Sequence, residues 1–142
     1  MLLVASRYLN HATPLWNLPG GRQREGELLP QTLAREFFEE TGLSIVVGAL
    51  LYLSESYDGA THFLNATFAV SSAGEPRVPA ADAHVVAFEW VPRQALGARL
   101  SVAVVREPLL AALGGDASSG TGRSCYFGFA DAGITIEFAD SP

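Results

Sequence analysis

Hydrophobic and polar positions divide the chain into strand-like runs and two helical regions. Runs of strand length that are rich in β-branched and aromatic residues lie at residues 1–6, 44–56, 61–70 and 84–91. Helical patterns cover the segment that has Pro30 in its first turn, and residues 93–113, where Pro108 is expected to kink or split the helix. Strands mixed with two helical regions predict an α/β or α+β sandwich.

The first helix has one acidic and one apolar face. At 100° per residue, Glu36, Glu39 and Glu40 fall within about 100° of one another. The apolar arc opposite holds Leu33, Ala34, Phe37 and Phe38. Gly42 is expected to adopt the left-handed conformation past the helix end, so the later acids lie in the last turn, where the helix dipole opposes each by about 0.3–1 kcal/mol.

Two interpretations of this acidic face remain open from the helix alone. It is either a solvated surface, with Arg35 and Glu39 as an i, i+4 ion pair, or a set of carboxylates that binds a cation. Glu36 and Glu40 also repel each other at i, i+4, and a bound cation would reverse that penalty.

Composition narrows the classes of function. The 142 residues fit one main domain, and 49% hydrophobic content is enough for a core. A net charge of −6 without a basic cluster argues against binding duplex nucleic acid. A lone Cys125 favours a reducing, cytoplasmic setting, and no apolar run reaches the length of a signal peptide core or a membrane span.

The residues around the acidic helix have a fixed spacing. Gly21 is followed after five residues by Glu27 and after seven more by Arg35 and Glu36. The complete set is Gly21, Glu27, Arg35, Glu36, Phe37, Glu39, Glu40, Gly42 and Leu43. This pattern resembles the Nudix box at every specified position. The flanking segments at residues 16–20 and 89–92 also resemble the family, and the resemblance spans roughly residues 1–113.

The resemblance implies a Nudix-type α/β/α sandwich with a mixed sheet, and a metal-dependent hydrolase. Such an enzyme uses Mg²⁺ or Mn²⁺ and an attacking water to cleave a pyrophosphate bond in a nucleoside diphosphate linked to another moiety. The implied metal ligands are Glu36, Glu39, Glu40 and a carbonyl at Gly20 or Gly21, and the implied catalytic set adds Arg35 and Glu27 as orienting residues. The structural alternatives are a plain turn at the glycines and a surface salt bridge between Arg35 and Glu27.

Members of the family commonly add an acidic residue from a later loop. Asp82 is the first candidate for this extra metal ligand or general base, with Glu55, Asp58 and Glu89 as alternatives. The histidines at 11, 62 and 84 are isolated in sequence and are interpreted as structural.

The small-molecule nucleotide substrate is not specified by any signature in the chain. Tyr52, Tyr57, His62 and Phe63 could stack on a base, although strand packing is the favoured interpretation. The competing class of function is a non-catalytic nucleotide-sensing module on the same fold, and a prenyl diphosphate isomerase is a third. The intact set of carboxylates argues against the sensor.

Residues beyond 113 lie outside the resemblance. We expect a flexible linker at 114–124 and a C-terminal β-hairpin extension at 125–142, with CYFGF and ITIEF as its arms. Family members usually have a strand before the one that residues 1–6 resemble, and this first strand is apparently missing. The hairpin, or a partner subunit in a homodimer, is expected to cover the sheet edge left by it.

Overall fold

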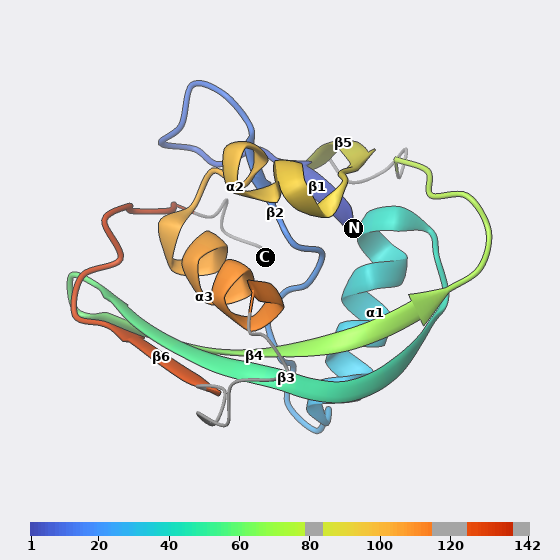
Figure 1. Cartoon of the computed structure of the whole chain (residues 1–142), viewed down its shortest axis with the longest axis horizontal. Coiled ribbons are helices and arrows are strands. Elements are labelled where there is room, and N and C mark those ends of the chain that lie inside the picture. Colours follow the sequence, from blue (N-terminus) through green and yellow to red (C-terminus); the bar gives the residue numbers. More distant parts are fainter. Residues whose placement is uncertain (79–83, 115–124, 138–142) are drawn as a thin grey trace.

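The computed structural model describes residues 1–78, 84–114 and 125–137, which form two sheets with helices on both sides (Figure 1). One sheet has the order β2-β1-β5 and contains Leu15–Asn17, Leu2–Ser6 and Val85–Trp90. The other has the order β4-β3-β6 and contains Thr61–Ser72, Ile45–Asp58 and Tyr126–Phe129. The helical elements are α1 (Leu29–Thr41), η1 (Arg93–Ala95), α2 (Leu96–Arg99) and α3 (Ala103–Gly114).

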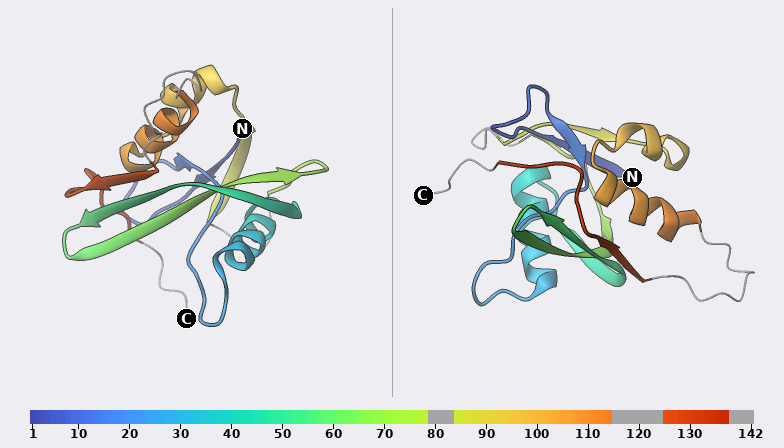
Figure 2. Two further views of the ribbon diagram at one scale, coloured as in Figure 1. Left: turned by 60° about the horizontal axis from the view of Figure 1, so that its bottom comes forward. Right: turned by 90° about the vertical axis from the view of Figure 1, so that its left-hand side faces the viewer.

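The strand β1 separates two hydrophobic cores, because neighbouring side chains of a strand point to opposite faces. Leu2 packs with Phe37 of α1 and with Leu43. Leu3 packs with the buried leucines of α2 and α3 and the residues around them, a cluster of Leu96, Leu100, Leu109, Tyr52 and Val91. All five residues of β1 are buried, which fits the run of apolar residues from Leu2 to Ala5, and the buried Ser6 ends the strand. Figure 2 shows α1 and α3 on opposite sides of the β3–β4 ribbon. The predicted sandwich of mixed α and β elements is therefore confirmed.

The helix α1 ends as its sequence predicts. Gly42 has a φ of 71° and its N–H donates to the carbonyl of Phe38 at 2.8 Å. The N–H of Arg77 donates to the carbonyl of Thr41 at 2.9 Å, and a Cβ on Gly42 would lie 2.8 Å from Nε of Arg77. Arg77 therefore places a cation at the helix end that carries the glutamates, where it offsets the unfavourable dipole. One detail differs from the expectation, since Phe38 is exposed.

The second helical region is interrupted, but not at Pro108. The break falls at Leu100–Val102, where Leu100 has an extended conformation with ψ of 122°. Ser101 exchanges two hydrogen bonds with the backbone of Trp16 there, through its N–H at 3.1 Å and its Oγ at 2.9 Å. Pro108 lies inside α3 and is buried. A long-range contact rather than proline therefore ends the first helical segment.

The expected C-terminal hairpin is wrong in one of its two arms. Tyr126–Phe129 forms β6 and pairs in parallel with β3, so this arm covers a sheet edge as expected. Residues 134–137 form no strand with β6. They hydrogen-bond instead to the loop that follows β1, where the carbonyl of Glu137 accepts the N–H of Leu9 at 3.1 Å. Side chains of Asn10 and His11 in that loop also bond to the segment, which fixes it beside the loop instead of beside β6. The expected linker at 115–124 lies outside the described residues.

Candidate functional site

Arg35 lies at the centre of the acidic helix face and contacts three glutamates. Its Nε and Nη2 donate to the two carboxylate oxygens of Glu27 at 2.6 and 2.9 Å. Its Nη1 donates to Oε1 of Glu36 at 2.7 Å and to Oε2 of Glu39 at 3.2 Å. One planar guanidinium therefore fixes a carboxylate from the loop and two from the helix, as bidentate geometry allows.

Glu40 is the buried member of the set, with 9% of its surface exposed. Its Oε2 accepts a hydrogen bond from the N–H of Gly20 at 2.9 Å. The interpretation of the acidic face as merely solvated does not fit this residue, because a carboxylate is rarely buried without a specific partner. Glu40 therefore ties α1 to the glycine turn that precedes it.

Gly21 lies against the carboxylate of Glu36. A Cβ at this position would be 2.3 Å from the carboxyl carbon of Glu36 and 2.4 and 2.6 Å from its oxygens. No side chain fits at that distance unless the carboxylate moves. The Gly20–Gly21 turn is thus more than a flexible connection, since its backbone occupies the space directly beside Glu36.

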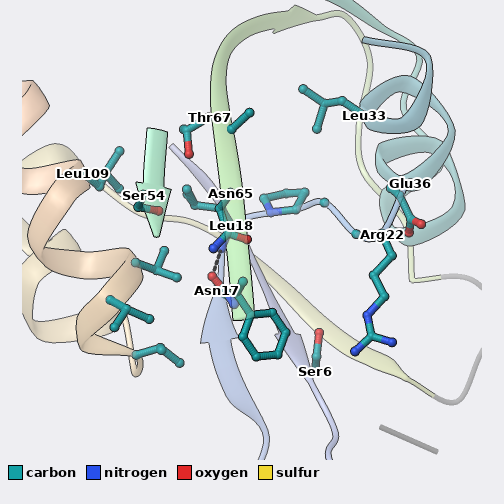
Figure 3. Close-up of a pocket in the computed structure, with 18 of the residues that line it drawn as sticks. Ser6, Asn17, Leu18, Arg22, Leu33, Glu36, Ser54, Asn65, Thr67 and Leu109 are labelled. Carbon is teal, nitrogen blue, oxygen red and sulfur yellow. Dashed lines mark hydrogen bonds between the residues drawn. The ribbon is translucent and has the colours of Figure 1, made fainter. Parts of the chain in front are cut away.

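The carboxylates border a large open cleft between the two sheets. Its volume is about 2230 Å³, which exceeds the roughly 300–1,000 Å³ of typical small-molecule pockets. In Figure 3, Arg22 and Glu36 lie at one side of this cleft, Ser54 and Leu109 at the other, and Asn65 between them. Residues of α1, β3 and β4 therefore line the same open region beside the glutamates.

The sequence pattern of the NUDIX domain matches residues 1–113, which is most of the chain. The chain belongs to the Nudix family. It is a Nudix hydrolase, and enzymes of this family act on small nucleotide substrates and generally use divalent metal ions.

Three solved structures have the same fold at low sequence identity. A mutator MutT protein of Bacillus halodurans has a TM-score of 0.69 at 19% identity, covering 95% of this chain and 84% of that one. The ORF135 protein of E. coli has a TM-score of 0.65 at 23% identity and covers 84% of both chains. The MutT protein of Methanosarcina mazei Go1 has a TM-score of 0.56 at 21% identity, covering 75% of this chain and 77% of that one. None of the curated proteins compared with this Nudix hydrolase matches it.

The donor set of the Nudix box fits a hard divalent cation. Carboxylate oxygens from Glu36, Glu39 and Glu40, and backbone carbonyls of the glycine turn, are the ligand types that Mg²⁺ and Mn²⁺ prefer. In the described part of the chain, no three acidic, histidine or cysteine side chains converge closely enough to hold a metal. The reason lies in their present partners, because Arg35 holds Glu36 and Glu39 while Gly20 holds Glu40.

The candidates for the additional metal ligand or general base that the structure describes bond to residues outside the Nudix box. Asp82, the first candidate, lies outside the described residues. Glu55 pairs with His62 and Tyr126, and Asp58 accepts a hydrogen bond from Oγ1 of Thr135 at 2.8 Å. Glu89 forms an ion pair with Arg99, whose guanidinium lies 4.1 Å from the centre of the Trp16 ring. These contacts do not bring the three alternatives together with the box glutamates.

Aromatic and histidine side chains have mainly structural contacts, as expected. His11 donates from Nε2 to the carbonyl of Thr135 at 2.8 Å, and His84 meets the ring of Tyr8 edge-on at 5.1 Å. Tyr52 is buried against Phe127, and the rings of Tyr57 and His62 stack at 4.8 Å. The remaining member of the sequence-predicted stacking set, Phe63, lines the cleft.

Sequence reasoning missed Tyr8, which lines the cleft together with Glu40. Its pKa is raised by burial first and by the negative charge of Glu40 second, while hydrogen bonds from Ser6 and Asn17 act in the opposite direction. No motif marks this position, because Tyr8 reaches the site only through the pairing of β1 with its neighbours.

Glu27 should make the stability of the protein depend on pH. Arg35 is the main cause that lowers the pKa of Glu27 from 4.5 to about 2. Folding favours the ionised form of Glu27. The contribution of Glu27 to the free energy of unfolding is therefore complete above about pH 4.5 and is lost as the pH falls through about 2. We expect Glu27→Gln to lower the free energy of unfolding at pH 6, and the difference from the parent to vanish toward pH 2. Urea denaturation across this range measures it, with the exposed Glu25→Gln as control, and a constant difference would contradict it.

Proposed function

We propose that this Nudix hydrolase cleaves a pyrophosphate bond in a nucleoside diphosphate linked to another moiety, with Mg²⁺ or Mn²⁺ and an attacking water. The observation that carries this proposal is the convergence of Glu27, Glu36 and Glu39 on Arg35, beside a glycine turn that is held by the buried Glu40. A pyrophosphate and this carboxylate set would repel each other without a cation between them. Held by these carboxylates, divalent ions would supply the positive charge that neutralises a leaving phosphate and lowers the pKa of an attacking water.

The residues of the Nudix box have two proposed roles, as metal ligands and as residues that orient those ligands. Glu36, Glu39 and Glu40 are the proposed ligands, together with a carbonyl of Gly20 or Gly21. Arg35 and Glu27 form the bidentate pair that keeps the ligand side chains oriented. The open cleft beside Glu36 gives the rest of the nucleotide room to bind. Asp82 stays the proposed additional ligand or base.

A nucleotide-sensing module is the alternative on the same fold. A sensor does not need every carboxylate, whereas this chain has all of them with specific partners. Assembly as a homodimer also stays a proposal, supported by β4, which lies at an edge of its sheet.

No described helix is long and apolar enough to cross a membrane.

A panel assay tests the activity directly. The full chain is incubated with nucleoside triphosphates, nucleoside diphosphate sugars and dinucleotides, with Mg²⁺ or Mn²⁺. Release of nucleoside monophosphate or inorganic phosphate is then measured. We expect turnover on at least one compound and none when EDTA is present. Nucleotide binding without turnover on any compound would favour the sensor.

Divalent metal should stabilise the protein. Glu36 and Glu39 share one guanidinium, so added cations relieve the remaining repulsion between the glutamates, and binding to the folded state raises the melting temperature. We expect Mg²⁺ and Mn²⁺ to shift the melting temperature upward, and a nucleotide to increase the shift. Differential scanning fluorimetry measures this, with Glu36→Gln as the variant in which the shift is reduced. An equal shift in parent and variant would place the bound metal elsewhere.

A further inference from the structure

The segment 132–137, which we call the C-terminal strap, closes the end of the cleft opposite α1. Figure 1 places it at the end of the sandwich away from α1, beside the tip of the β3–β4 hairpin. It begins where the N–H of Ala132 donates to the carbonyl of Tyr57 at 2.8 Å. The strap lies outside the residues that match the NUDIX domain.

Hydrogen bonds fasten the strap to both sheets. Oγ1 of Thr135 donates to Oδ1 of Asp58 at the end of β3, at 2.8 Å. The carbonyl of Thr135 accepts from Nδ2 of Asn10 at 2.7 Å and from Nε2 of His11 at 2.8 Å. The N–H of Glu137 donates to Oδ1 of Asn10 at 3.0 Å. The strap is therefore fixed across the cleft from β3 to the loop after β1.

The side chains of the strap alternate between these contacts and the cleft. Ala132, Ile134 and Ile136 line the cleft, while Thr135 bonds away from it to Asp58. The two isoleucines are half-buried in the absence of any ligand. Apolar side chains that are fixed by their backbone and only partly covered provide a rigid contact surface for an apolar group.

The cleft changes character along its length. Glu36, Glu39 and Glu40 line the cleft on α1, hydroxyl and amide side chains line it on β3 and β4, and Ala132, Ile134 and Ile136 line it on the strap beside Asp58. The hydroxyl and amide groups are Ser54, Ser56, Asn65 and Thr67, of which Figure 3 labels three along the cleft wall. A ligand oriented by this gradient would place phosphates at the glutamates and its uncharged end at the strap, because charged groups resist burial against apolar side chains.

We infer that the strap is the wall against which the uncharged ring of the substrate, its nucleobase, packs. This inference rests on the proposed function for the direction of the ligand. It assigns a binding role to Ile134 and Ile136, which touch no phosphate. Removing either side chain should weaken the binding of the nucleoside half of a ligand and leave the diphosphate half unaffected.

Two halves of a substrate, titrated separately, test the inference. Isothermal titration calorimetry in Mg²⁺ measures the Kd of AMP, GMP, CMP and UMP, and the Kd of inorganic diphosphate. For the monophosphate that binds the parent most tightly, we expect Ile134→Ala and Ile136→Ala each to raise Kd about fivefold to tenfold. The Kd of inorganic diphosphate should change by less than about twofold. Val46→Ala, an exposed apolar truncation that does not line the cleft, should change neither value.

The outcomes separate this inference from the proposed function. Unchanged Kd values for the monophosphate overturn the inference, as does equal weakening of both probes, or a parent that binds none of the four monophosphates. If either alanine variant unfolds, Ile136→Met keeps the apolar volume and is expected to bind like the parent, while Ile136→Asn weakens the monophosphate alone. Absence of turnover on every compound of the panel, with these binding changes intact, would reject the proposed hydrolysis and leave the strap's role standing.

Discussion

Glu40→Gln is expected to lower kcat by about 100- to 10,000-fold, equivalent to about 3–5 kcal/mol of activation free energy. The amide keeps the shape of the side chain and an oxygen that accepts the N–H of Gly20, which Glu40 binds at 2.9 Å. It removes an anionic metal ligand. Removing a negative charge from the last turn of α1 also relieves repulsion with the helix dipole. We therefore expect an equal or higher melting temperature without metal.

Steady-state kinetics on a compound that the parent hydrolyses, together with metal-free thermal unfolding, measures both effects. Glu107→Gln removes an exposed glutamate from α3 and is the matched control. Glu39→Gln should also lower turnover, because Glu39 belongs to the same carboxylate set. Near-parent kcat in Glu40→Gln would contradict the mechanism, and a large loss of melting temperature would make the residue structural instead.

Gly21→Ala is expected to lower kcat by about 100-fold with only a small change in melting temperature. The added Cβ would lie 2.3 Å from the carboxyl carbon of Glu36, so the carboxylate must move. The end of a glutamate side chain moves at little cost to stability, whereas a displacement of about 1 Å at a reacting site costs about 100-fold in rate. The metal-induced thermal shift should fall together with kcat.

The control for this variant is Gly114→Ala, because a Cβ at Gly114 meets no atom within 4 Å. It should leave kcat and the metal-induced shift unchanged. If Gly21→Ala retains parental activity, Glu36 is not held in its working position by the glycine turn. The assignment of that turn to the site would then be wrong.

The local elements and the box geometry could be predicted from the sequence, because they depend on spacing along one helix and one turn. Gly42 ends α1 as predicted, and Arg35 pairs with glutamates of the box, Glu27 and Glu36. Residues brought in by distant pairing could not be predicted. Arg77 reaches the end of α1 only after the β3–β4 hairpin has returned the chain there, and no local pattern marks it.

The C-terminal residues show the same limit. Ile134 and Ile136 are two positions apart in ITIEF, and both line the cleft. Periodicity does not identify the partner of an extended segment, however, since β6 and the loop after β1 both present backbone groups. The hydrogen bonds of Asn10 and His11 decide it, and these residues are more than 120 positions away.

The central position of β1 also has a consequence for the order of folding. Leu2 pairs with Trp90 and Val4 with Asn17, so β1 is synthesised before both of its partners, and the partner β5 is made only after β3 and β4 are complete. The free edge of β3 is paired only after Tyr126–Phe129 has been synthesised. Such long separations between paired residues slow folding. A ribosome-bound chain that stops before Val85 leaves one edge of β1 unpaired, and a chaperone that binds apolar strands would recognise it at that stage.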